Sequence, residues 1–231
     1  MNQGYVPSID RPVFEVGEDA RATFIARTYA HLFGAMGAFV AIEFALFKSG
    51  VAERIAGAVG QNWFIAFGAF MVVSWLARGA AHRAKTLGVQ YIALAAFVSV
   101  WAVLFVPLLY IADAVAPGAI ASAAVVTLGG FAGLTFIAFW TRKDFSFLRG
   151  ILNFGGVLAL LAIVGGMIFG FQLGTWFSVG MVGLMGASIL YDTSNVLHHY
   201  PENRYVAASI ELFGSVALMF WYVLQLFMND D

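Results

Sequence analysis

The chain has 231 residues, of which 61% are hydrophobic and only 11% are charged. Soluble domains carry about a quarter of charged residues, so this composition excludes an ordinary soluble domain. The net charge of −1 favours no particular partner, and the absence of cysteine excludes disulfides, thiolate metal ligands and a cysteine nucleophile. The first residues lack the basic-then-apolar profile of a signal peptide.

Apolar runs of about 20 residues recur along the chain, and each is long enough to cross a hydrocarbon layer of about 30 Å as a helix. We therefore predict an all-α membrane protein with seven spans in one bundle. A polar cytoplasmic arm (1–23) precedes the transmembrane domain (24–228), and a short acidic tail (229–231) follows it. The predicted spans are 24–47, 62–77, 88–112, 119–141, 150–171, 174–197 and 205–228.

Two of the early spans contain residues that are unusual in a membrane helix. Glu43 lies near the far end of the first span, where we expect a solvated carboxylate at the interface. Pro107 lies within the third span and predicts a kink, because proline has no N–H to donate.

The distribution of basic residues predicts the orientation of the bundle. With the N-terminus in the cytoplasm, ten of the twelve Lys and Arg residues fall on the cytoplasmic side, and only Lys48 and Arg54 on the other. Cytoplasmic loops of membrane proteins carry such an excess of positive charge. Seven spans then place the C-terminus outside.

Asp192, near the end of the sixth span, and Glu211, early in the seventh, are the main candidates for a functional site. Both lie on the side of the connecting turn, so they should have a similar depth in the cytoplasmic half. Two carboxylates facing each other there would share a proton and titrate as a unit, which suits a pH switch. The protonated pair would keep the helices together, and the ionised pair would repel and admit water or a cation. Alternatively, Asp192 caps the end of its helix at the interface.

The seventh span carries a polar stripe. At 100° per residue, Glu211, Ser215, Tyr222 and Gln225 fall within an arc of about 80°. The stripe predicts that this helix faces the bundle interior or a water-filled path, although hydrogen bonds between helices would explain it equally well. Arg78, at the end of the second span, either pairs with one of the carboxylates as a charge latch or anchors the helix at the interface.

Enzymatic chemistry has little support in the sequence. The histidines lack the spacing of a metal site such as H-E-x-x-H, so no firm metal site is predicted and calcium is expected only near Asp192 and Glu211. Ser188 has no histidine at membrane depth on the following span to act as its base. We therefore predict a non-enzyme without a cofactor, in which calcium is at most a permeant ion.

Three segments of the chain carry a resemblance to a known family: 141–148 (TRKDFSFL), 189–195 (ILYDTSN) and 205–226. Together they resemble the Bax-inhibitor/YccA family in its bacterial YccA-type form. The first is similar to the loop before that family's fifth span, the second to the end of its sixth span and the third to its last span. The resemblance implies six helices around a central seventh, and a place in the bacterial inner membrane.

The resemblance also implies a mechanism and a departure from it. Family members are associated with pH-sensitive calcium leak through an aspartate in each of the last two spans, with an arginine on the second span nearby. Asp192 matches the first aspartate and Arg78 the arginine, but Ser215 stands where the second aspartate would be. Glu211 lies one turn away on the same face, and either replaces the missing carboxylate or leaves the sensor broken.

Two functions follow from these observations. The first is a pH-gated membrane channel that passes a cation, with Asp192 and Glu211 setting its state. The second is a non-conducting regulator that binds a membrane partner through its N-terminal arm. The resemblance implies the membrane-bound AAA protease FtsH as that partner, since YccA-type members are associated with its modulation.

Overall fold

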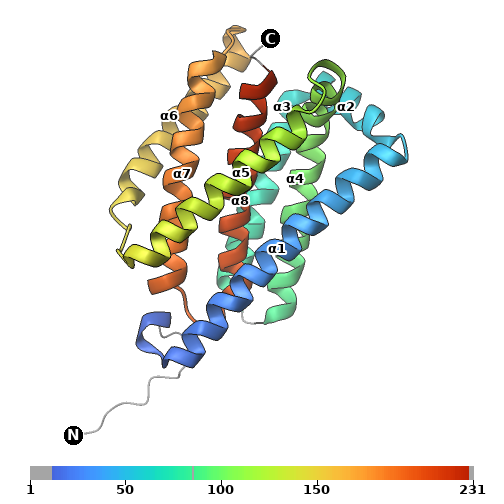
Figure 1. Cartoon of the computed structure of the whole chain (residues 1–231). Coiled ribbons are helices and arrows are strands. Elements are labelled where there is room, and N and C mark those ends of the chain that lie inside the picture. The colour runs from blue at the N-terminus through green and yellow to red at the C-terminus, as the bar shows by residue number, and fades with distance from the viewer. Residues whose placement is uncertain (1–11, 85, 229–231) are drawn as a thin grey trace, which may run out of the picture.

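A computed structural model describes residues 12–84 and 86–228 of the chain (Figure 1). Within them, seven helices are long and apolar enough to cross a membrane. These helices are α1 (Glu18–Lys48), α3 (Trp63–Arg83), α4 (Leu87–Val115), α5 (Ala119–Thr141), α6 (Leu148–Phe169), α7 (Gly174–His198) and α8 (Tyr205–Met228). A short helix α2 (Val51–Gln61) and a 3-10 turn η2 (Val13–Glu15) complete the described structure. The predicted all-α membrane fold is confirmed.

Helix α8 forms the centre of the bundle. In its most apolar stretch 78% of the residues are buried, against 6% in α6. Helices α1, α3, α4, α5 and α7 all pack directly against α8, whereas α6 packs against α7 on the outside. The predicted central position of the seventh span, which is α8, is confirmed, and α6 lies at the periphery of the bundle.

The predicted spans match the observed helices closely, with differences at the beginning of the chain and at α3, which runs to Arg83 and therefore contains Arg78 instead of ending before it. Helix α1 begins at Glu18, within the predicted polar arm, because Glu18 and Asp19 place negative charge at the positive end of the helix dipole. Helix α2 was not predicted; with 11 residues it is too short to span the membrane. Helix α4 continues through Pro107 as one helix.

The expectation of a solvated Glu43 was wrong. Its residue exposure is only 6%, and neither carboxylate oxygen has a hydrogen-bond partner in the described structure. Helix α1 ends at Lys48, one residue past the predicted end, but α2 then folds back against α1 and α4. Glu43 therefore lies inside the packed structure although it is near the end of its helix.

The η2 turn lies at the end of the bundle where α7 connects to α8 (Figure 1). The Val13 N–H donates to the Tyr200 carbonyl over 2.8 Å, and the Val13 side chain is fully buried. We call this the basic end, because the following residues lie at it or close to it: Arg78, Arg83, Arg142, Arg149 and Arg204. Helix α8 ends at the opposite end of the bundle (Figure 1). The rest of the predicted arm (1–11), the acidic tail (229–231) and Lys85 lie outside the described residues.

Candidate functional site

Asp192 lies in a small polar cluster between α7 and α8. The Ser215 hydroxyl donates a hydrogen bond of 2.6 Å to Oδ2 of Asp192, and the Ser188 hydroxyl lies 3.4 Å from the same oxygen. The two serine hydroxyls are 2.8 Å apart. Ser188 precedes Asp192 by one helical turn, so both face α8. The aspartate is thus placed inside the bundle, and its partners join the two last helices.

Glu211 has different partners, on α3. The Nη1 atom of Arg78 lies 3.3 Å from Oε2 of Glu211, which forms an ion pair between α3 and α8. Nδ1 of His82 lies 3.9 Å from the other carboxylate oxygen. Arg78 is therefore paired with Glu211 and is more than an interfacial anchor.

Gly214 leaves the space that the Arg78 guanidinium occupies. A Cβ atom at this position would lie 2.6 Å from Nη2 of Arg78 and 3.4 Å from the Phe97 ring. The guanidinium carbon of Arg78 also lies over the Phe97 ring, 5.3 Å from its centroid. The arginine is therefore held between the backbone of α8 and an aromatic ring of α4.

The two carboxylates lie at the same depth but not in the same hydrogen-bonded group. Asp192 is six residues from the end of α7 and Glu211 six residues from the start of α8, so both lie about 9 Å inside their helices. In the part of the chain that the structure describes, no hydrogen bond joins them. The site is an aspartate–serine pair beside a glutamate–arginine pair.

The remainder of the polar stripe on α8 also faces α7. Ser178 of α7 donates to Oε1 of Gln225 over 3.1 Å. The Tyr222 ring packs edge-on against Phe177, with 5.8 Å between the centroids, and the tyrosine is buried. The contacts at Tyr222 and Gln225 hold α7 and α8 together at the end of the bundle that lies away from the carboxylates.

The loop 142–147, between α5 and α6, docks on the end of α7. The Phe145 N–H donates to the Ser194 hydroxyl over 2.9 Å, and the His199 ring lies 3.5 Å from Asp144. The Ser146 N–H donates to Asp144 over 2.8 Å and lowers the pKa of that carboxyl group. The two segments that resemble family motifs, 141–148 and 189–195, therefore contact each other.

Tyr200 covers the site at the basic end. It is half-buried, and the loss of hydration around its phenol raises its pKa well above the ordinary value. The protonated hydroxyl lies 3.3 Å from Nε2 of His82, whose Nδ1 lies 2.9 Å from the Arg78 carbonyl. These two contacts place the His82 ring between the Tyr200 phenol and the backbone of α3.

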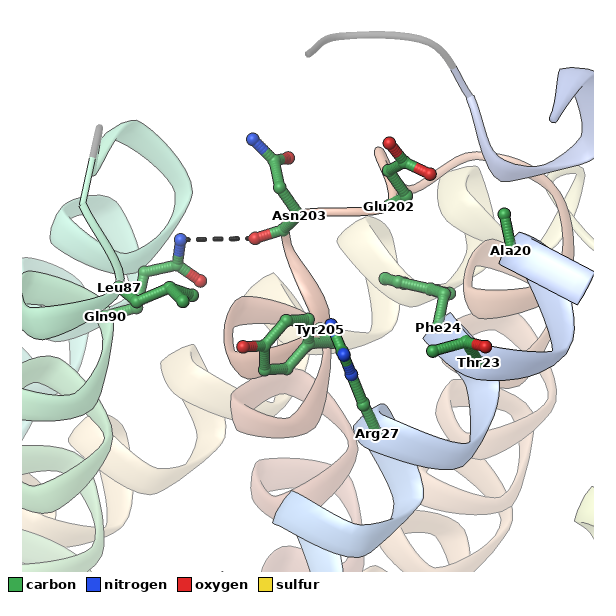
Figure 2. A pocket seen from close by; sticks show the side chains of 9 residues that line it. All are labelled: Ala20, Thr23, Phe24, Arg27, Leu87, Gln90, Glu202, Asn203 and Tyr205. Carbon is green, nitrogen blue, oxygen red and sulfur yellow. Dashed lines mark hydrogen bonds between the residues drawn. The ribbon is translucent and has the colours of Figure 1, made fainter. Parts of the chain in front are cut away.

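A pocket of about 400 Å³ opens at the basic end between α1, α4 and the α7–α8 connection (Figure 2). The Gln90 side-chain N–H donates to the Asn203 carbonyl over 3.4 Å (Figure 2). Gln90 Oε1 and Asn203 Oδ1 are buried without a partner in the described structure. Arg27 lies over the Tyr205 ring, 5.5 Å from its centroid. The two oxygens are therefore unpaired acceptors inside the packed structure beside the pocket, and the charged side chains that line the pocket are Arg27 and Glu202.

Sequence reasoning missed several residues of the site. Ser188 was considered only as a nucleophile, although it precedes Asp192 by four residues on one helix face and could have been recognised as its partner. Gly214, Phe97 and Tyr200 carried no such signal, since their roles depend on the packing of α3 and α4 against α8. Within the described residues, no group of three or more His, Asp or Glu side chains could hold a metal ion.

Comparison with known proteins gives matches in bacteria and a plant. An uncharacterized protein of Pseudomonas aeruginosa is 38% identical over 111 residues, which are 47% of this chain and 49% of that protein. Protein LIFEGUARD 4 of Arabidopsis thaliana is 33% identical over 116 residues (47% and 46%). The modulator of FtsH protease YccA of Escherichia coli is 32% identical over 87 residues (37% and 39%).

The matches thus span about half or less of the length of these curated relatives. The sequence profile of a family described as "Inhibitor of apoptosis-promoting Bax1" covers much more, residues 21–231. Together with the seven apolar helices, this match identifies a multi-pass membrane protein that belongs to the Bax inhibitor family.

Proposed function

We propose that this protein is a proton-sensitive cation leak pathway, in which Asp192 and Glu211 set the open and closed states. The Arg78–Glu211 ion pair, which ties α3 to α8 beside the Asp192–Ser215 hydrogen bond, carries the proposal. Ionisable groups at membrane depth are costly, and they commonly mark ion pathways and proton relays. Three helices meet at such groups here.

The charges of the site suggest how protonation acts. With Asp192 protonated, the only negative charge of the pair is on Glu211, and Arg78 neutralises it. Ionisation of Asp192 adds a second negative charge that the single arginine does not neutralise. The excess negative charge loosens the contact between α7, α8 and α3, and attracts water and a cation such as calcium. The leak therefore increases with pH.

The orientation belongs to the same proposal. Placing the basic end in the cytoplasm follows the positive-inside rule and puts the C-terminus outside. A location in the inner membrane is supported by the name of one relative, the inner membrane protein YccA of Escherichia coli. Both carboxylates then lie in the cytoplasmic half, where they respond to cytoplasmic pH.

Calcium flux into proteoliposomes of the purified protein, measured from acidic to mildly alkaline pH, tests the proposal. We expect pH-dependent flux that Asp192→Asn holds low and pH-independent, because asparagine mimics the protonated state. Glu211→Gln should flatten the profile, and Ser215→Asp should raise the flux or shift its midpoint. Asp113→Asn, at an exposed acid near the end of α4, is the matched control.

Two results would overturn the leak proposal. The first is flux no higher than in empty liposomes at any pH. The second is a wild-type pH profile in the Asp192→Asn protein. Either result would favour the second candidate function.

That second candidate is a membrane regulator of an AAA protease. It is favoured by the relative named modulator of FtsH protease YccA, and by the pocket that Arg27 and Glu202 line at the basic end.

Degradation of a membrane substrate by FtsH in reconstituted vesicles tests this function. Thr23 lines the pocket, so Thr23→Trp should fill it and reduce any effect on degradation. Ala22→Trp, at the exposed neighbouring position, is the control that leaves the pocket open. Equal effects of both variants, or no effect of the wild type on degradation, would contradict the regulator.

A further inference from the structure

A cavity of about 860 Å³ lies between α3, α4, α6, α7 and α8. Trp63, Phe67 and Phe70 line it from one face of α3, at helical spacing, and Gly156 and Ile163 line it from one face of α6. Helix α6 has its packing partner in α7, so the facing stripes of α3 and α6 are separated by the cavity. In a membrane protein this flank faces hydrocarbon.

The cavity is long enough for a lipid chain. Trp63 and Arg78 of α3 both line it and are fifteen residues apart, which corresponds to about 22 Å along a helix. One leaflet occupies about half of a hydrocarbon layer of about 30 Å. The apolar lining can therefore enclose an acyl chain that lies parallel to α3.

Toward the basic end, the two helices that flank the cavity each carry an arginine beyond its lining, past Arg78 on α3 and before Gly156 on α6. Helix α3 ends at Arg83 and α6 begins at Leu148, followed by Arg149, and both arginines are exposed. Arg78, inside the cavity, has a side chain that is 41% exposed, and its Nε is buried without a partner in the described structure. Arginine side chains pair well with phosphate oxygens.

We propose that this cavity binds one acyl chain of an anionic phospholipid, with the headgroup between Arg83 and Arg149 and the chain running toward Trp63. Apolar lining, length and charge at one end together match such a lipid. The inference is independent of the proposed leak, because it requires no movement of α3.

Tryptophan fluorescence tests the site, because Trp63, Trp101 and Trp221 line the cavity. The protein with Trp75→Phe, Trp140→Phe and Trp176→Phe lacks the three highly exposed tryptophans, so its emission reports on the cavity. In vesicles of phosphatidylglycerol brominated near the chain ends, we expect most of this emission to be lost relative to unbrominated vesicles. Emission that is equal in both vesicles would overturn the proposal.

A cavity-filling variant separates a lipid in the cavity from lipid around the bundle. A Cβ at Gly156 meets open space, so Gly156→Phe places a ring into the cavity and should largely restore the emission. Gly133→Phe on α5, also facing open space, fills no part of the cavity and should leave the quenching unchanged. Equal quenching in both variants would mean that lipid around the bundle quenches the tryptophans. That result would overturn the proposal that a lipid chain occupies the cavity.

The headgroup is tested by native mass spectrometry of the detergent-purified protein. We expect one retained phosphatidylglycerol, and a preference over phosphatidylcholine that the double variant Arg83→Gln, Arg149→Gln abolishes. Arg54→Gln, in α2 and away from the basic end, should keep the preference. Equal retention of both lipids by the wild type would overturn the headgroup assignment.

Discussion

Gly214→Ala should weaken the ion pair between α3 and α8 without changing any charge. The added Cβ would lie 2.6 Å from Nη2 of Arg78, whereas uncrowded contacts need about 3.5 Å. The guanidinium must therefore move by about 0.9 Å. If this movement is directed away from Glu211, the separation of 3.3 Å increases to about 4.2 Å.

The electrostatic attraction that Arg78 and Glu211 lose in this variant follows from Coulomb's law with an effective dielectric constant of about 20. The attraction is about 5 kcal/mol at the original separation and about 4 kcal/mol at the larger one. Because the Arg78 side chain is 41% exposed, we halve this loss to about 0.5 kcal/mol for solvent screening. A weaker contact with the Phe97 ring adds about 0.5 kcal/mol, so the total is about 1 kcal/mol.

Thermal unfolding in detergent measures this effect against a matched glycine. Alanine in place of a helical glycine gains about 0.5–1 kcal/mol, so Gly214→Ala should leave the Tm nearly unchanged. Gly130→Ala on α5, where the Cβ would make an ordinary contact with Met219, should raise it by about 2–4 °C per kcal/mol. An equal increase in both variants would refute the conclusion that Arg78 fills the space beside Gly214.

Three further predictions concern stability. Arg142 follows the last residue of α5 and has a positive φ of 49°, a conformation that costs a non-glycine residue about 1–2 kcal/mol. Arg142→Gly should therefore raise the Tm, whereas Lys143→Gly should not. Equal increases in Tm for both variants would contradict this prediction. The hydrogen bond from the Ser146 N–H lowers the folded-state pKa of Asp144. The ionised Asp144 carboxylate therefore stabilises the fold above its unfolded pKa of about 3.9, and this stabilisation is lost as the pH falls through the folded-state pKa. Wild type and Asp144→Asn should therefore differ in Tm at neutral pH and converge in acid. Glu43→Leu removes a buried carboxyl group without a partner and should stabilise by about 1–3 kcal/mol; a lower Tm would show that this group has a partner.

The sequence alone predicts depth in the membrane better than direction around a helix axis. Counting residues placed Asp192 and Glu211 at the same depth, because the rise per residue is constant. The seven spans followed from the length of the apolar runs. The resemblance aligned Ser215 with a missing aspartate, and in the structure its hydroxyl does contact Asp192.

The partners of each group could not be predicted in the same way. Arg78 pairs with Glu211 because α3 packs against α8 at Gly214, a contact between helices far apart in the chain. The burial of Glu43 depends on α2 folding back, and α2 has too few residues to give a span signal. Such features arise from tertiary packing, which no local pattern encodes.

Arg78 belongs both to the ion pair with Glu211 and to the wall of the lipid cavity, so the two proposals meet at one side chain. The Arg78 side chain is 41% exposed, so a phospholipid oxygen that accepts from its guanidinium would change the position of the guanidinium relative to Glu211. Binding free energies are reciprocal: if lipid changes the strength of the ion pair, loss of the pair must change lipid affinity by the same factor. Glu211→Gln should therefore alter phosphatidylglycerol retention if the two sites are coupled, and leave it unchanged if Arg78 serves only the pair. Glu211→Gln therefore has a readout in each of two assays, calcium flux and phosphatidylglycerol retention. A change in both would show that α3 couples the lipid cavity to the ion pair, and a change in flux alone would show that it does not.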